Sequence, residues 1–360
     1  MLKSLILVLA AMTFAASLNA ADGKQVVYIG GYGPTLTCFA LDAAAGTLAP
    51  LSTSEGGNNP SYLAWDPSRR FMYAINEGDP GKVIAFAIEP ATGALKKINE
   101  AAVAVGGACH IACHPSGKWV IATNYGSGHI VVLPVKADGG VGDPLPSLPP
   151  GKRAHQSVFD ASGNFFFVPF LGDELIAQYR FDVATGALTA NTPPSVATKK
   201  GAGPRHMVFS ADGKAAYGIN EIDSTLTSYA YDAAKGVLTA QVTVPTLPAG
   251  FTGKNSTAHV VISPDGKFVY GSNRGHNSIA IFKAGAGGTL SLVGHETGGG
   301  EIKVPRDFSL TPDGSLLIVA NQDGGNVTVF KRDAAAGTLT KASTVAVPGK
   351  PAFVGVVTLP

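Results

Sequence analysis

A short turn motif recurs seven times along the chain at nearly equal intervals. It consists of small or acidic residues followed by Gly, any residue and Leu, and one of the seven copies is degenerate. Successive motif glycines are 46 to 52 residues apart, at Gly46, Gly93, Gly140, Gly186, Gly236, Gly288 and Gly337. A fixed period of this length is typical of propellers and other repeat architectures. This repeat therefore constrains the fold more than any other feature of the sequence.

Two further turn signals occur in phase with this motif. One is a Pro-Asp-Gly type turn, as at 263–266 and 311–314, with a short apolar run on each side. The other usually opens with Asn, as at Asn76 and Asn273, and an alternating strand such as 278–282 follows it. Each repeat therefore predicts a meander of four antiparallel strands. Seven such repeats predict an all-β fold, a seven-bladed β-propeller of four-stranded antiparallel blades.

The two ends of the repeat region complement each other. Residues 26–32 match the second strand of a blade whose first strand is missing at that point, and residues 351–357 match the missing first strand. We therefore expect the N- and C-terminal strands to pair and close the ring.

The first twenty residues have the pattern of a secretory signal peptide. Lys3 precedes an apolar run over 5–18, which is too short to span a bilayer of ~30 Å as a helix. Small residues at Ala20 and Ala21 would allow cleavage there. We expect a signal peptide over 1–20, a propeller domain over 21–360, and a periplasmic protein with no membrane contact in its mature form. An uncleaved amphipathic anchor is the alternative.

Charge and cysteine content exclude several classes of function. The chain has 27 Lys+Arg against 25 Asp+Glu, so no basic excess exists to neutralise the phosphates of a nucleic acid.

Cys109 and Cys113 each precede a histidine. The spacing between the two cysteines is one residue too long for the Cys-x-x-Cys-His haem motif. On a strand they would be ~13 Å apart, too far for a disulfide or a shared metal ion. We expect packed or channel-facing thiols.

Blade geometry predicts which residues meet at one end of the central channel. The start of each first strand and the turn after each second strand lie at the same mouth. The second residues of the seven first strands are Ser61, Cys109, His155, Arg205, His259, Arg306 and Ala352. The turns add Tyr32, Glu77, Tyr125, Glu221, Arg274 and Gln322. Ionisable groups are concentrated in this set although only 14% of the chain is charged.

Four of these groups come from three adjacent repeats and should face one pocket: His155, Arg205, Glu221 and Arg274. Cations beside a carboxylate and a histidine suit an anionic or carbonyl substrate. Simpler interpretations remain for each: a salt bridge between Arg205 and Glu221 that closes a blade, a neutral buried histidine, or arginines at the rim without a role.

Several motifs resemble one known family of propellers. The segments are 201–206 (GAGPRH), 220–225 (NEIDST), 263–270 (SPDGKFVY), 272–279 (SNRGHNSI) and 304–308 (VPRDF). They are similar to the lactonase family of seven-bladed β-propellers, which contains propeller-type 6-phosphogluconolactonases and carboxy-muconate cyclases, and the resemblance covers essentially the whole mature chain.

The resemblance implies a hydrolase that opens a sugar-acid lactone, of the aldono or 6-phosphoglucono type, in carbohydrate metabolism. It implies catalytic roles for His155, Arg205, Glu221 and Arg274, without a metal ion or other cofactor. We add His259, Arg306, Asn220 and Tyr125 as substrate-binding residues. The expected partner is a small lactone or carboxylate, bound by a monomer. A muconate-type cycloisomerase and a non-catalytic binding scaffold are the alternatives.

Overall fold

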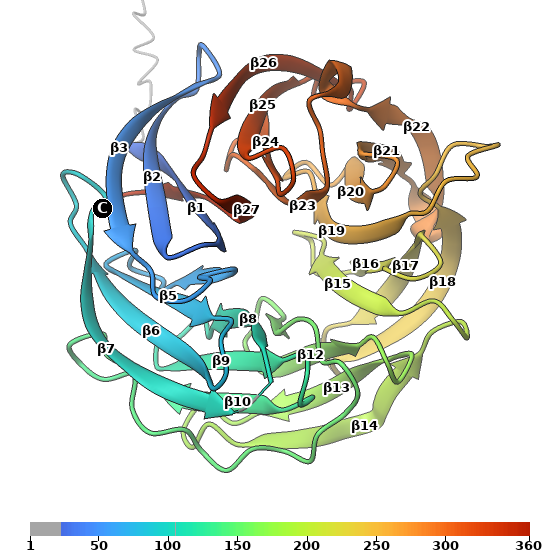
Figure 1. Cartoon of the computed structure of the whole chain (residues 1–360). Coiled ribbons are helices and arrows are strands. Elements are labelled where there is room, and N and C mark those ends of the chain that lie inside the picture. Colours follow the sequence, from blue (N-terminus) through green and yellow to red (C-terminus); the bar gives the residue numbers. More distant parts are fainter. Residues whose placement is uncertain (1–22, 105) are drawn as a thin grey trace, which may run out of the picture.

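The structure is a computed structural model that describes residues 23–104 and 106–360. The predicted signal peptide, 1–20, lies outside the described residues. Seven antiparallel sheets stand around a central axis (Figure 1). The predicted seven-bladed β-propeller is therefore confirmed.

Each blade is a meander whose first strand lies nearest the axis. Blade 1 contains β27 (Lys350–Thr358), β1 (Gln25–Tyr32), β2 (Thr35–Asp42) and β3 (Thr47–Glu55), and blade 2 contains β4 (Leu63–Trp65), β5 (Phe71–Asn76), β6 (Gly81–Ile88) and β7 (Leu95–Ala104). Blade 3 contains β8 (Ala108–Cys113), β9 (Trp119–Asn124) and β10 (Ile130–Pro134), and blade 4 contains β11 (Val158–Phe159), β12 (Phe165–Phe170), β13 (Leu175–Phe181) and β14 (Leu188–Ala197).

The remaining three blades follow the same order. Blade 5 contains β15 (Pro204–Phe209), β16 (Ala215–Asn220), β17 (Thr225–Asp232) and β18 (Val237–Pro245). Blade 6 contains β19 (Ser256–Ile262), β20 (Phe268–Arg274), β21 (Ser278–Ala284) and β22 (Leu290–Glu296). Blade 7 contains β23 (Pro305–Leu310), β24 (Leu316–Asn321), β25 (Asn326–Arg332) and β26 (Leu339–Ala346). The helices of the described chain are two short 3₁₀ turns, η1 (Ala286–Gly288) and η2 (Gly298–Gly300).

Blade 3 departs from the predicted four strands. Its fourth position is occupied by a loop that makes one isolated bridge, between Val135 and Val141. The segment that follows, 143–150, contains four prolines. Proline has no N–H to donate to a strand ladder, so this segment cannot form a regular outer strand.

The ring is closed by the two ends of the chain. β1 pairs with β27 over eight residues, from Gln25 opposite Thr358 to Tyr32 opposite Lys350. Figure 1 shows these strands side by side in one blade. The predicted closure is confirmed.

The hydrophobic core is distributed between the blades. Each of its seven clusters joins residues of two neighbouring sheets. In one of them, for example, Tyr28 of blade 1 is grouped with Met72 of blade 2.

No helix in the described part of the chain is long and apolar enough to cross a membrane. The three cysteines are free, and Cys109 and Cys113 lie on strand β8 as expected.

Candidate active site

The start of five of the seven first strands contains a local irregularity that directs a side chain into the channel. In β15 the register shifts between Pro204 and His206, so Arg205 has no opposite residue on β16. The same shift occurs around Cys109 in β8 and around Arg306 in β23. Such a bulge re-aims the side chain of the extra residue. These residues therefore leave the sheet and line the mouth.

The side chains expected at the mouth line a narrow pocket with room for about one water molecule. Its lining residues are Tyr32, Ser61, Tyr62, Glu77, Cys109, His155, Arg205, His206, Arg306, Asp307 and Ala352. Six of them were expected at second positions of first strands and two in the turns after second strands. The blade geometry deduced from the repeats therefore locates this pocket correctly.

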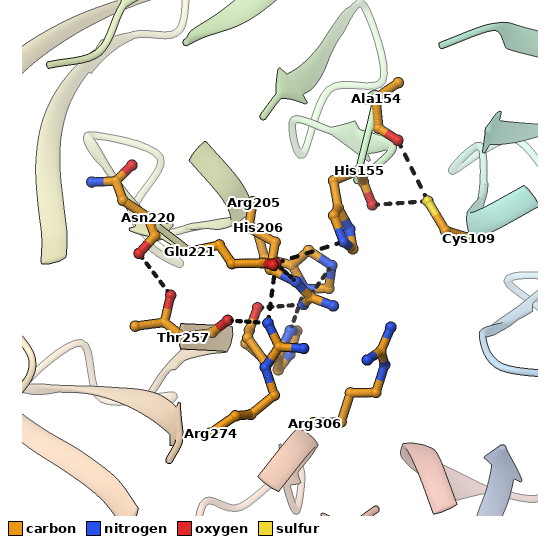
Figure 2. Close-up of polar contacts among 12 residues, drawn as sticks. Cys109, Ala154, His155, Arg205, His206, Asn220, Glu221, Thr257, Arg274 and Arg306 are labelled. Carbon is orange, nitrogen blue, oxygen red and sulfur yellow. Dashed lines mark hydrogen bonds and ion pairs between the residues drawn. The ribbon is translucent and has the colours of Figure 1, made fainter. Parts of the chain in front are cut away.

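The Glu221 carboxylate is the centre of the polar network beside this pocket. Its Oε2 atom lies 2.7 Å from Nε of Arg205 and 3.1 Å from Nη2 of Arg274. Nε2 of His155 lies 4.0 Å from the same oxygen. Figure 2 shows the three side chains converging on Glu221 from neighbouring blades. The four residues predicted as catalytic are thus brought together.

Backbone contacts hold both arginines in place. Nη1 of Arg205 donates to the carbonyl oxygen of Ala258 at 2.5 Å, and Nη2 of Arg274 donates to that of Thr257 at 2.7 Å. Both carbonyls belong to β19, so one strand fixes the two cations relative to each other. The guanidiniums are therefore oriented before any ligand binds, which favours stabilisation of a developing negative charge.

Burial controls the charge state of the site. It lowers the pKa of His155 well below the usual range, and the nearby Arg205 and Arg306 lower it further. His155 is therefore neutral at pH 7. Burial also lowers the pKa of Arg274 to about 10, which still leaves this side chain protonated at neutral pH.

The four predicted substrate-binding residues occupy different positions. Arg306 lines the pocket, where its guanidinium lies 5.2 Å from the ring centre of Tyr32 and Nη1 donates to Gln322 at 3.2 Å. Tyr125 lies beside the site, with its ring edge-on to His155 at 5.4 Å between centroids. Arg306 therefore lies in the pocket wall and Tyr125 beside His155.

Asn220 and His259 are placed differently from the expectation. The Asn220 amide donates to the hydroxyls of Thr225 and Thr227, so it points into the blade and secures the turn. In β19 Thr257 pairs with Asn273 as Pro204 pairs with Asn220 in β15, so Ala258 takes the position that Arg205 has in β15. His259 consequently lies one step deeper in the channel.

Three pocket residues escaped the sequence analysis: Tyr62, His206 and Asp307. Each directly follows a residue that was identified at the start of a first strand. Strict strand alternation would turn this next side chain away from the channel, but the bulge allows both neighbours to face it. The Gly-Pro-Arg-His segment contained the signal for His206.

The Cys109 thiol also lines the pocket. Burial raises its pKa to about 12, so it is protonated at neutral pH. Its Sγ lies 3.4 Å from the carbonyl oxygen of Ala154.

In the described ranges no group of three or more His, Cys, Asp or Glu side chains is arranged to hold a metal ion.

Comparison with known families decides the class of this propeller. The family model described as "Lactonase, 7-bladed beta-propeller" matches residues 26–356. The chain belongs to this lactonase family. The resemblance deduced from the sequence motifs is therefore confirmed.

Relatives of this lactonase-family chain match it over nearly their whole length. The 6-phosphogluconolactonase of Bacillus subtilis (strain 168) is 30% identical over 342 residues, which cover 90% of this chain and 96% of the relative. The 6-phosphogluconolactonase of Pectobacterium carotovorum subsp. carotovorum (strain PC1) is 30% identical over 339 residues, covering 93% and 99%. The structure of the periplasmic gluconolactonase PpgL of Pseudomonas aeruginosa superposes with a TM-score of 0.87 at 29% identity, covering 93% of this chain and 99% of that one.

Proposed function

We propose that the protein hydrolyses a sugar-acid lactone at the mouth of its channel, with His155, Arg205, Glu221 and Arg274 as the catalytic residues. The observation that supports this most is the position of Glu221 Oε2, within 4.0 Å of all three other groups. Relatives named 6-phosphogluconolactonase and a neighbour named gluconolactonase point to the same substrate class.

The pair formed by His155 and Glu221 would act as the base. A water placed between Nε2 and Oε2 would lose a proton to the pair while its oxygen attacks the lactone carbonyl carbon. The ring C–O bond then breaks, and the same proton passes to the leaving alkoxide. A neutral histidine beside a carboxylate suits this two-way transfer, which typically contributes ~10²–10⁴ in rate.

The arginines would stabilise the carbonyl oxygen as it becomes negative. Arg205 and Arg274 are fixed by Glu221 and by backbone carbonyls, so their N–H groups need no rearrangement during the reaction. Loss of one donor of this kind typically lowers turnover by ~10²–10³. Arg306, on the opposite wall, would bind an acidic group or a hydroxyl of the substrate.

We also propose that the protein acts in the periplasm. The signal-peptide pattern over 1–20 supports export, and the neighbour PpgL is named a periplasmic enzyme. An exported enzyme would meet unphosphorylated lactones rather than sugar phosphates. Gluconolactone-type substrates are therefore the first to test.

The experiment is a proton-release assay at pH 7 with glucono-, galactono-, 6-phosphoglucono- and muconolactone, with and without a chelator. The mature chain is compared with Glu221→Gln and with Asp323→Asn, which changes an exposed carboxylate in a turn on the same face of blade 7. We expect chelator-resistant turnover that falls by about 10²-fold or more in Glu221→Gln and stays unchanged in Asp323→Asn. Absence of turnover on every lactone would contradict the proposal, and ring closure of a muconate would replace it with a cycloisomerase.

A further inference from the structure

A second layer of polar side chains lies below the active site, inside the channel. It contains His206, His259 and Asp307, which come from the first strands of blades 5, 6 and 7. His206 and Asp307 are almost fully buried, and His259 is nearly so. Buried polar groups of this kind need partners: His206 contacts Arg205 and His259 at hydrogen-bond distance, and His259 faces the Asp307 carboxylate at ion-pair distance.

The three residues form a continuous chain that begins at Arg205. Nη1 of Arg205 lies 3.3 Å from Nε2 of His206. Nδ1 of His206 lies 2.7 Å from Nδ1 of His259. Nε2 of His259 lies 3.3 Å from Oδ1 of Asp307. Figure 2 shows His206 directly beside Arg205, at the start of this chain.

Both imidazoles in the chain are neutral. Burial lowers the pKa of His206 well below the usual range and that of His259 to about 3, and Arg205 lowers both further. A neutral imidazole has one N–H donor and one acceptor nitrogen. Each ring therefore donates one hydrogen bond and accepts one.

Arg205 determines the direction of the whole chain. Because a guanidinium only donates, Nε2 of His206 must accept, and its proton must be on Nδ1. That proton is donated to Nδ1 of His259, which places the proton of His259 on Nε2. The donor sequence then runs from Arg205 through both rings to Asp307.

Oδ1 of Asp307 is suited to be the last acceptor in this chain of hydrogen bonds. It already accepts the backbone N–H of Phe308 at 2.8 Å. Burial raises the pKa of this carboxyl to about 8, but a proton on Oδ2 leaves Oδ1 free to accept. Oδ1 therefore accepts from His259 in either charge state.

We infer that Asp307, His259 and His206 are positioning residues that act through one hydrogen-bond chain to hold Arg205 against Glu221. The inference rests on the proposed function only for its effect on turnover. If each hydrogen bond in the chain ran in the opposite direction, His206 would present an N–H to the N–H of Arg205, and the contact would become repulsive. The oxygen at the far end of the chain thereby fixes the orientation of the catalytic guanidinium.

The first test is ¹⁵N NMR of the histidine side chains in the intact mature protein at pH 7. We expect His206 protonated on Nδ1, His259 protonated on Nε2, and a slowly exchanging Nε–H signal for Arg205. A His206 protonated on Nε2, or either ring as an imidazolium, would overturn the inference. This test needs no substrate, so its result is independent of whether the protein is a lactonase.

The second test breaks the chain at its end. Asp307→Leu removes the acceptor, whereas Asp307→Asn keeps an oxygen at the Oδ1 position. We expect the leucine variant to leave the Nε2–H of His259 without its acceptor, to lose the slow Arg205 signal, and to reduce kcat about tenfold or more with little change in KM. The asparagine variant should retain the slow Arg205 signal and keep kcat within about twofold.

Controls separate this effect from general damage to the channel. The His110 ring packs against that of His206, 5.5 Å between centroids, but its Nδ1 accepts the backbone N–H of Ser157 and it makes no hydrogen bond to the chain. His110→Gln therefore controls for packing alone and should leave the signals and kcat unchanged. If Asp307→Leu does not fold, His259→Phe breaks the chain one step nearer to Arg205. A folded, chain-breaking variant with unchanged Arg205 signal and unchanged kcat would overturn the inference.

Discussion

At the residue scale, the site depends on ionisable groups that are buried close to one another. Arg205 is 2% exposed, yet it faces a carboxylate, a backbone carbonyl and an imidazole acceptor. A buried charge is stable only when its hydrogen-bonding groups are paired in this way. The same burial keeps the channel histidines neutral, which links the chemistry of the site to the stability of the fold.

We predict a stability maximum at about pH 7. Burial lowers the pKa of four channel histidines: His110, His155, His206 and His259. Below about pH 6.5 the unfolded chain binds protons on them that the folded chain does not, so stability falls with pH by about 1.4 kcal/mol per unit for each proton. The raised pKa of Asp307 acts in the opposite direction, because the folded chain keeps one proton from about pH 4 to 8.

Urea unfolding at pH 5, 7 and 8 measures this balance. We expect a marked loss of stability from pH 7 to 5, since four histidines outweigh one carboxyl group, and a small loss from pH 7 to 8 as Asp307 loses its proton. His110→Gln should reduce the acid slope by about one proton. Unchanged or higher stability at pH 5 would show that these histidines are protonated in the folded protein.

Arg306 should distinguish acidic from neutral substrates. Among the ion pairs of the described residues none involves Arg306, so its charge is available to a ligand in the pocket. We expect Arg306→Gln to raise KM for 6-phosphogluconolactone about tenfold or more and to leave KM for gluconolactone nearly unchanged. Arg153→Gln, which changes an exposed arginine over the Tyr125 ring, is the matched control. Equal effects on both substrates would assign Arg306 a purely structural role.

At the element scale, the repeats predicted nearly all strands and turns, because each turn has its own residue signature. The exceptions have local causes. Prolines in 143–150 prevent a regular fourth strand in blade 3, and in β19 the residue paired with Asn273 is Thr257 rather than Ala258, which displaces His259 by one position. Sequence patterns show where a strand begins but not which residue the bulge leaves unpaired. The layer below the mouth was therefore missed, although the mouth itself was found.

The turn before β15 illustrates how an element positions catalytic groups. Gly203 has a φ of 66°, and its carbonyl oxygen accepts the backbone N–H of Glu221 at 2.7 Å. A Cβ at this position would lie 2.7 Å from Cγ1 of Ile222. One glycine therefore sets the spacing between the strand start that carries Arg205 and the turn that carries Glu221.

Gly203→Ala should reduce both stability and turnover. A left-handed conformation costs a non-glycine residue about 1–2 kcal/mol, and the added methyl group would displace the adjacent turn. The control is Gly213→Ala in the hairpin at the other end of the same blade, where φ is 65° and no atom lies within 4 Å of the added Cβ. Gly203→Ala should lose more stability in thermal unfolding than Gly213→Ala, because only its added methyl group meets a neighbouring side chain, and only Gly203→Ala should lose kcat. Equal turnover in the two variants would show that this turn does not position the catalytic residues.

At the scale of the whole molecule, the active site exists only if the ring is closed. Its residues come from blades 4, 5 and 6, and the rest of the pocket wall comes from blades 1, 2, 3 and 7. The pairing of β1 with β27 completes blade 1 and so closes that wall. Closure was predictable because two half-blades remained at the ends of the repeat, whereas the contacts across the channel depend on side-chain geometry that no repeat encodes.

We predict that truncation after Val347 prevents formation of the closed propeller. The lost segment contributes Phe353 and Val357 to the core shared with blade 2, and Val354 to the core shared with blade 7. Burial of each such side chain stabilises by about 1.5–3 kcal/mol, and the total stability of a protein is only about 5–15 kcal/mol. Removal of the strand also leaves β1 without its partner across all eight positions. The truncated chain should show no cooperative thermal transition and no turnover.

A synthetic peptide of residues 348–360 tests whether the loss is caused by open ends rather than by general misfolding. Added in trans, it should restore both the transition and turnover in a concentration-dependent way, because a ligand that binds only the folded state stabilises it. Thr358→Ala in the intact chain, at an exposed position of the same strand, should have little effect. A truncated chain that melts like the intact protein would mean that six blades hold the site without closure. Restoration by the peptide would instead make strand pairing between the termini a condition for catalysis.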